Sequence, residues 1–344
     1  MSTDNYQQVR PVADLDAPLS LPTRSAPADW SDVLAEYPAL RPFADAIGNT
    51  PLIEVPGDGG ATILAKCEWV NPAGSIKDRV AFGMLAALLR EGSGQPLQVL
   101  EYSGGNLSLA LSLLCQAIGV PLRLVLSSGS PPSLLDTVRG RGAEVELVDK
   151  DLGFVAVVRR AIDIARAEPA WSLLYQHRNL GNIQTHETTT GAELLDQLPA
   201  GTRLTHWVAS IGTGGTLVGV LRALRGRFPD VLPVAVSPAE LPYGSDQPPN
   251  GLAKYAGSGG FGDGVRQPFV PPIEAGLHTD TVSYPDALAA MAEFRTLTGT
   301  AIGSSSAANW LVARKIAADL PASAMVATVF PCAGTAEEWK RLTW

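Results

Sequence analysis

The sequence predicts an α/β protein in which parallel β-sheets carry helices on both faces. From Ile47 onward, short apolar strands alternate with helical stretches of ten or more residues, a spacing typical of parallel strands joined by crossover helices. The length of 344 residues suggests about two domains of ~150 residues each. Glycine-rich loops follow some of the strands, and ligands in such folds bind at the carboxyl ends of the strands.

Each expected element rests on an apolar run that is bounded by turn residues. Short runs indicate strands, and apolar patterns that continue for about three turns indicate helices. The helix from Arg79 ends before Gly92, a residue type that commonly follows a helix. Strands are expected at 61–66, 97–100, 122–126, 144–148, 207–211, 233–236 and 324–330. Helices are expected at 79–91, from the loop at 103–106 to Ile118, and at 133–141, 154–167, 217–225, 285–298 and 307–318.

Residues 1–44 differ from the rest of the chain, since they are rich in Pro, Ala and Asp and show few apolar repeats. We interpret them as an N-terminal extension or arm. Its aromatic residues Trp30, Tyr37 and Phe43 could pack on the body of the protein or on another subunit.

Charge and composition exclude several classes of partner. The net charge of -8 and the lack of a dense Lys/Arg stripe argue against nucleic acid. The longest apolar region, 107–126, is interrupted by glycine, proline and arginine, so it is not expected to span a membrane.

The three cysteines are widely spaced and no signal pattern begins the chain, so a cytoplasmic protein without disulfides is expected. No metal site is expected from the four dispersed histidines, His177, His186, His206 and His278.

The first candidate site is Lys77, in the segment Asn71-Pro-Ala-Gly-Ser-Ile-Lys77-Asp-Arg79. Asn-Pro-Ala-Gly is typical of a turn, and Ser75 is a plausible helix N-cap, which places Lys77 in the first helical turn. The positive end of the helix dipole there favours the neutral amine, which is the form that a Schiff base requires. Considered alone, a solvated surface lysine is the better interpretation.

Two glycine loops between a strand and a helix are candidate anion sites. The loop that contains Gly212, Thr213, Gly214, Gly215 and Thr216 offers backbone N–H groups, hydroxyls and a helix N-terminus, which suit a terminal phosphate. A dinucleotide fingerprint fits poorly because the spacing is G-x-G-G, and a structural turn is the remaining alternative. The loop from Ser103 to Ser108 could bind a carboxylate, although an ordinary helix-capping turn explains it equally well. A third glycine-rich segment, 257–264, is expected to be a loop that is either flexible or packed against a ligand.

These motifs occur in one order that resembles the pyridoxal phosphate (PLP)-dependent enzymes of fold type II, the cysteine synthase and cystathionine β-synthase group. The resemblance extends from Ile47 to Trp339. It implies two domains, a large one formed by 45–82 and 183–344 and a smaller mobile one formed by 83–182, with the cofactor in the cleft between them. It also implies a homodimer that acts on a small amino-acid substrate together with a small nucleophile.

The resemblance assigns roles to individual residues. Lys77 would form the internal aldimine and act as the catalytic base, and Gly212 to Thr216 would bind the cofactor phosphate. Asn106 would contact the O3′ oxygen, and Ser304 would lie near the pyridine ring. Substrate would be bound by Ser103, Gly104, Gly105, Asn106, Leu107 and Gln176.

Three positions depart from the family pattern. Gly104 and Leu107 replace a serine and a threonine of the T-S-G-N-T loop, which removes two hydroxyls and is expected to add apolar bulk at Leu107. Ala333 stands where the family usually places a hydroxyl against the pyridine nitrogen, so Cys332 or Thr335 would have to make that contact. These changes leave the cofactor site credible and put the ordinary substrate in doubt.

The implied reaction is a β-replacement on O-acetyl-, O-phospho- or free L-serine. It would proceed through an aminoacrylate, to which a sulfur or nitrogen nucleophile adds to give cysteine or a β-substituted alanine, and a role in specialised metabolism is one option. One alternative is β-elimination, as in a serine or threonine dehydratase or a cysteine desulfhydrase. Another is a catalytically silent PLP-binding scaffold for a partner protein.

Overall fold

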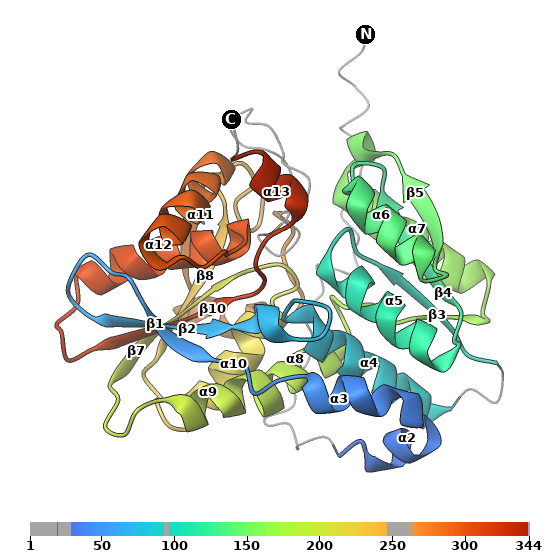
Figure 1. Cartoon of the computed structure of the whole chain (residues 1–344), viewed down its shortest axis with the longest axis horizontal. Helices are drawn as coiled ribbons and strands as arrows, with labels where there is room; N and C mark the ends of the chain where they lie inside the picture. The colour runs from blue at the N-terminus through green and yellow to red at the C-terminus, as the bar shows by residue number, and fades with distance from the viewer. Residues whose placement is uncertain (1–18, 20–28, 93–95, 246–261, 263, 343–344) are drawn as a thin grey trace, which may run out of the picture.

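The computed structural model describes residues 19, 29–92, 96–245, 262 and 264–342. It contains two sheets, one of six strands and one of four, which lie side by side (Figure 1). We call the six-stranded sheet with α8 to α13 the six-stranded half, and the other sheet with α5 to α7 the four-stranded half. The expected α/β architecture with parallel-type sheets is confirmed.

The six-stranded sheet has the order β1-β2-β10-β7-β8-β9. All neighbouring pairs are parallel except β1 and β2, which are antiparallel. The strands are β1 (Leu52–Val55), β2 (Thr62–Cys67), β7 (Leu204–Ser210), β8 (Leu232–Pro238), β9 (His278–Val282) and β10 (Met325–Phe330). Of these, the edge strands β1 and β9 were not expected from the sequence.

The four-stranded sheet has the order β5-β4-β3-β6, and all its pairs are parallel. Its strands are β3 (Gln98–Tyr102), β4 (Leu122–Ser127), β5 (Glu144–Val148) and the short β6 (Trp171–Leu173), which the sequence did not suggest. Alternate residues face opposite sides, as the pleat requires: Val99 packs towards α4 and α5, whereas Leu100 packs towards α7.

Helices cover both faces of each sheet. In the six-stranded half, Ile63 of β2 packs with α11 and α12, while the adjacent Leu64 packs with α10 on the opposite face. A π-helical segment (His186–Gly191) links α8 to α9. The helices are α4 (Lys77–Glu91), α5 (Asn106–Ile118), α6 (Pro132–Gly140), α7 (Gly153–Ala167), α8 (Leu180–Thr185), α9 (Ala192–Gln197), α10 (Gly215–Arg225), α11 (Tyr284–Thr298), α12 (Ser304–Ala318) and α13 (Ala336–Lys340). No helix among the described residues is long and apolar enough to cross a membrane.

The described part of the arm packs on the chain's own body. It forms two short helices, α2 (Ser31–Glu36) and α3 (Arg41–Ala46). Phe43 is buried in the core around α4 and α5, and Trp30 contacts Phe82 edge-to-face with ring centroids 6.4 Å apart. Of the two expected locations for these aromatic residues, the structure shows the body.

Helix α4 connects the two halves. It begins at Lys77, beside the six-stranded sheet, and its residues Val80 to Leu89 pack against α5 in the core of the four-stranded half. The domain boundary expected between residues 82 and 83 therefore falls inside a continuous helix. We retain the two-domain division as a proposal in which α4 is the shared element.

A buried network of charges joins β2, α4 and α9. Arg79 Nε donates to Glu68 Oε2 at 2.8 Å, and Arg79 Nη1 donates to Glu193 Oε1 at 2.6 Å. The other carboxylate oxygen of Glu193 accepts from Lys66 Nζ at 2.8 Å. Thr50 completes the network, because its hydroxyl donates to Glu68 and its carbonyl accepts from Lys66.

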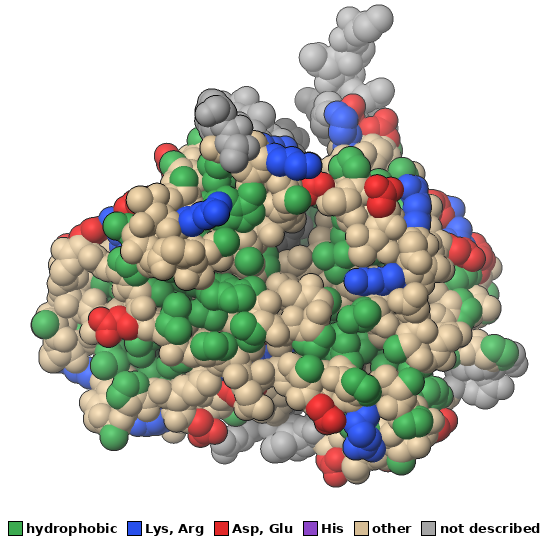
Figure 2. All heavy atoms as spheres, viewed as in Figure 1, with side chains coloured by type: hydrophobic (Ala, Val, Ile, Leu, Met, Phe, Trp, Pro, Cys, Tyr) green, Lys and Arg blue, Asp and Glu red, His purple; other side chains and the backbone are tan. Residues whose placement is uncertain are grey.

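Surface charges of both signs are interspersed on the face shown in Figure 2. Lys and Arg side chains lie among Asp and Glu side chains and do not form a continuous stripe on that face.

Candidate active site

Lys77 is held at the start of α4 by a closed turn. The Asp78 carboxylate accepts hydrogen bonds from the N–H groups of Ala73 at 2.6 Å and Ser75 at 2.9 Å. Ile76 N donates to Pro331 O at 2.9 Å, which ties the turn to the end of β10. The expectation that Ser75 is the N-cap is wrong: the helix starts one residue later and its N-cap is Ile76, although Ser75 Oγ accepts from Lys77 N at 3.1 Å.

The Lys77 side chain is half-buried, and its amine is easier to deprotonate than that of an ordinary lysine. Burial lowers the pKa of Lys77 to about 8, and the nearby charge of Glu101 opposes part of this decrease. In the part of the chain that the structure describes, no hydrogen bond or ion pair holds Nζ in place. The sequence predicted a shift in this direction, but from the helix dipole, whereas loss of hydration is the main cause here.

Glu101 is a buried carboxyl group that sequence reasoning missed. It lies near the end of β3, where Oε1 accepts from Tyr102 N at 2.9 Å and Oε2 accepts from Gln176 N at 3.3 Å. Burial raises the pKa of Glu101 to about 8, although the N–H groups favour the ionised form. The available signal was an acidic residue in an otherwise apolar strand directly before a glycine loop.

The loop from Ser103 to Leu107 joins β3 to α5. Gly105 is the N-cap of α5, and Ser108 N donates to its carbonyl at 3.1 Å, which leaves the N–H groups of Asn106 and Leu107 without a partner within the helix. Ser108 Oγ donates to Ser103 O at 2.6 Å and stabilises the turn, and Gln176 Nε2 donates to Tyr102 O at 2.8 Å beside it. This geometry gives a group of backbone donors that suits a carboxylate.

Leu107 does not contribute its side chain to this loop's exposed surface. Its side chain is fully buried in the core formed with α4 and α5. The expectation that Leu107 adds apolar bulk to the substrate site is therefore wrong, because the bulk fills the core of the four-stranded half. Only its backbone remains a candidate for substrate binding.

The loop from Gly212 to Thr216 joins β7 to α10 and requires glycine at its centre. Gly214 has φ +84°, and a Cβ there would lie 2.8 Å from Val270 Cγ2. A Cβ on Gly215 would lie 2.0 Å from Asn182 Oδ1. Glycine at both positions lets the loop pack closely against Val270 and Asn182, and Gly215 N donates to Thr213 Oγ1 at 3.2 Å. A glycine turn of this kind at a helix N-terminus suits a phosphate.

Two threonine hydroxyls of this loop are held by side chains from α8 and the π-helical segment. Thr213 Oγ1 accepts from Asn182 Nδ2 at 3.0 Å. Thr216 Oγ1 lies 3.1 Å from His186 Nε2, and His186 Nδ1 lies 3.0 Å from Thr190 Oγ1. Burial keeps the pKa of His186 well below its usual value, so the imidazole is neutral and can accept the Thr216 proton or donate one.

The residues expected near the pyridine ring are only partly free to bind it. The Ser304 hydroxyl donates to Glu338, and the Thr335 hydroxyl accepts from Glu338 N at 3.1 Å as the N-cap of α13. Burial raises the pKa of the Cys332 thiol, and a hydrogen bond with the Asn106 side chain partly opposes this. Cys332 thus lies beside Asn106. Of the two residues expected to contact the pyridine nitrogen, Cys332 and Thr335, it is the one whose side chain does not cap α13.

These features fit PLP. The sites brought together are a half-buried lysine with a lowered pKa, a glycine loop at a helix N-terminus, and a thiol beside Asn106. The segment 257–264 lies outside the described residues except for Gly262 and Gly264. No group of three or more potential metal ligands occurs in the described ranges.

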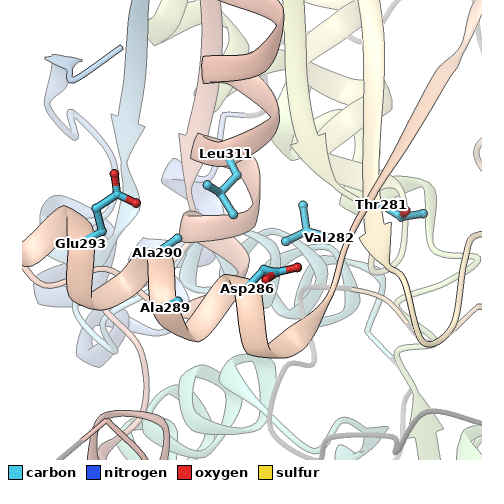
Figure 3. A pocket seen from close by; sticks show the side chains of 7 residues that line it. All are labelled: Thr281, Val282, Asp286, Ala289, Ala290, Glu293 and Leu311. Atoms are coloured by element: carbon cyan, nitrogen blue, oxygen red, sulfur yellow. The ribbon is translucent and has the colours of Figure 1, made fainter. Parts of the chain in front are cut away.

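Two surface hollows accompany this site. One lies between β9, α11 and α12 and is lined by Thr281, Val282, Asp286, Ala289, Ala290, Glu293 and Leu311 (Figure 3). It contains none of the residues above. The other is lined by residues of both halves, including Ser130, Pro132, Thr335 and Glu337, and it adjoins the candidate site.

The chain belongs to the family described as pyridoxal-phosphate dependent enzymes, whose model matches residues 43–331. This assigns the class of protein and confirms both the expected family and its cofactor.

Individual relatives indicate which enzymes of this family the chain is similar to. Cysteine synthase B of Campylobacter jejuni is 31% identical over 282 residues, which cover 81% of this chain and 90% of the relative. Cysteine synthase B of Escherichia coli is 36% identical over 198 residues, and the match spans 64% of that enzyme's length. Among solved structures, the O-acetylserine-dependent cystathionine β-synthase of Helicobacter pylori matches with a TM-score of 0.76 and 26% identity, covering 86% of this chain and 96% of that one. The chain is therefore similar to cysteine synthases and their neighbours.

Proposed function

We propose that this protein catalyses a PLP-dependent β-replacement on an activated L-serine and adds a small sulfur or nitrogen nucleophile. The observation that carries the proposal is Lys77, whose pKa of about 8 makes its amine available near neutral pH. The relatives support it, because those named above are cysteine synthases or an O-acetylserine-dependent enzyme. A solved O-ureido-L-serine synthase, 26% identical with a TM-score of 0.73, is a relative whose name indicates a different product.

When bound, PLP would supply an electron sink for the carbanion chemistry at the substrate's α-carbon. The protein's part follows from the geometry. Gly212 to Thr216 would bind the phosphate, Asn106 would orient the ring, and the N–H groups at the start of α5 would bind the substrate carboxylate. The Lys77 amine, once released by substrate, would take the α-proton and later return it.

The proposal is tested by titrating the purified holoenzyme with O-acetyl-, O-phospho- and free L-serine. We expect the cofactor absorbance near ~410 nm to shift towards ~470 nm with at least one of them. Lys77→Ala is expected to abolish covalent attachment of the cofactor, measured by mass spectrometry after borohydride reduction. A Lys77→Ala protein that still holds PLP covalently, or a wild-type enzyme that responds to no serine derivative, would contradict the proposal.

Replacement and elimination are separated by their products. With a thiol or amine nucleophile present, replacement gives a β-substituted alanine, whereas elimination gives a 2-oxo acid. Accumulation of 2-oxo acid alone would assign the enzyme to the lyases. A stoichiometric protein partner combined with spectral silence towards amino acids would favour the scaffold.

We also propose a cytoplasmic homodimer. The family resemblance and the widely spaced cysteines support this proposal. Sedimentation equilibrium tests it, with about twice the 36.1 kDa chain mass expected.

A further inference from the structure

We propose that Ser130 supplies the hydroxyl that Gly104 lacks and binds the α-carboxylate of the amino-acid substrate. This inference rests on the proposed function and names a substrate-binding residue for it. Ser130 lies in the turn between β4 and α6, where its N–H donates to Ser127 O at 2.9 Å.

The Ser130 hydroxyl lies next to the position of the missing side chain of the carboxylate loop. A Cβ built on Gly104 would lie 3.1 Å from Ser130 Oγ, which is the nearest described atom. In the T-S-G-N-T pattern that this loop resembles, a serine stands at the position of Gly104. A hydroxyl from the end of the neighbouring strand therefore lies in direct contact with the space that a side chain at 104 would enter.

The Ser130 hydroxyl is buried without a partner. The residue is only 8% exposed, and Oγ has no hydrogen bond among the described residues. A buried hydroxyl that makes no hydrogen bond is unfavourable, and such groups in native proteins usually have a partner. A ligand oxygen bound at the start of α5 would provide that partner.

The sheet topology explains how two separate segments reach one ligand. Strands β3 and β4 are parallel neighbours, with Tyr102 paired to Val125, so their carboxyl ends meet at the same edge. The loop after β3 supplies backbone N–H groups, and the turn after β4 supplies Ser130. The ligand chemistry is a carboxylate, because a hydroxyl donor added to the N–H groups of Asn106 and Leu107, at the start of a helix, favours an anion.

The experiment compares wild type, Ser130→Ala, Gly104→Ser/Ser130→Ala and Ser128→Ala in spectral titrations of the holoenzyme. The probe is O-acetyl-L-serine, or the serine derivative to which wild type responds. Ser130→Ala is expected to raise the half-saturating concentration ~10- to 100-fold, as for a lost hydrogen bond to a charged group. The cofactor band of the free enzyme should not change.

The double variant is expected to recover most of the affinity, because a serine at 104 restores a hydroxyl there. Ser128→Ala is the control, since that exposed hydroxyl accepts from Lys150 N at 2.9 Å.

The outcomes separate this inference from the function on which it rests. If wild type responds and Ser130→Ala has the same half-saturating concentration, the inference is overturned while the function stands. If wild type responds to no amino acid, the function itself fails. Thermal unfolding gives an independent readout, because removal of an unpartnered hydroxyl should not lower the unfolding temperature. A less stable Ser130→Ala that the double variant does not rescue would show a structural role and overturn the proposal.

Discussion

At the scale of single residues, the central feature is that the pKa of Lys77 is lowered while the pKa of Glu101 is raised. Burial makes the cation less favourable at one residue and the anion less favourable at the other, and it brings both pKa values to about 8. Each charge stabilises the other, so the two groups titrate as a coupled pair.

This coupling predicts a pH profile for cofactor attachment. Only the neutral Lys77 amine attacks PLP, so the rate of reattachment to apoprotein should rise with pH around a midpoint near 8. Glu101→Gln removes the negative charge that raises the pKa of Lys77, and we expect the midpoint to move to lower pH. Stopped-flow absorbance measures both profiles. A midpoint near the ordinary lysine value of 10.5 would contradict this explanation.

At the scale of elements, the loop from Gly212 to Thr216 shows how strictly the backbone is specified. Gly214→Ala places a Cβ at φ +84° and 2.8 Å from Val270 Cγ2. We expect a loss of about 1–3 kcal/mol of stability from backbone strain, and weaker cofactor binding because the N–H groups shift. Gly140→Ala is the matched control, since a Cβ there has open space. Chemical unfolding measures the stability, and equilibrium dialysis measures the affinity for PLP. If Gly214→Ala and Gly140→Ala had the same stability and the same affinity, backbone strain at Gly214 would be refuted.

The sequence predicted most buried strands to within a few residues and missed elements with weak apolar patterns. The buried strand β4 was expected at 122–126 and occurs at Leu122–Ser127, because an apolar run follows a glycine and a proline there. β9 reads His-Thr-Asp-Thr-Val and lies at a sheet edge, where few apolar residues are needed, so its sequence carries little strand signal. The stretch 180–197, which forms α8, the π-helical segment and α9, was not expected to be helical, because its many Asn, Gln, Glu and Thr residues leave no clear apolar repeat.

Within the candidate site, local motifs were predictable and contacts between distant segments were not. The lysine turn and both glycine loops are contiguous, so their chemistry is visible in sequence. Ser130 and Gly104 come together only because β3 and β4 are neighbours in the sheet, and no local sequence pattern predicts that these two strands pair. The orientation of Leu107 depends on which face of α5 meets the core, and the resemblance of a short loop motif does not reveal that face.

At the scale of the whole molecule, the buried charges around Arg79 couple pH to stability. Burial alone would raise the pKa of Glu193, but hydrogen bonds and charges from Arg79 and Lys66 lower it to about 2. A lowered pKa means that this stabilisation is complete above the ordinary value of 4.5 and is lost as pH falls towards 2. The network should therefore contribute to acid unfolding.

Glu193→Gln tests this contribution. Removal of the charge leaves Arg79 and Lys66 without their shared carboxylate, and we expect a loss of ~3–5 kcal/mol at pH 7, as for a broken buried ion pair. The same variant should lose less additional stability than wild type between pH 4.5 and pH 2. Glu293→Gln, which breaks the more exposed contact with Arg314, should cost at most about 1 kcal/mol. Urea unfolding across this pH range is the measurement, and parallel curves for wild type and Glu193→Gln would disprove the coupling.

The course of α4 through both halves has a mechanical consequence. The turn that precedes its first residue is hydrogen-bonded to the end of β10, because Ile76 N donates to Pro331 O. Its later turns pack in the core of the four-stranded half. In any rigid rotation of one half relative to the other about this junction, displacement grows with distance from the axis. If the axis passed through the start of α4, the Lys77 backbone would lie close to it, whereas the loop at 103–107 and the Ser130 turn, which belong to the four-stranded half, would lie farther out. The Lys77 amine would then move little while the groups proposed to bind the carboxylate changed their distance from it.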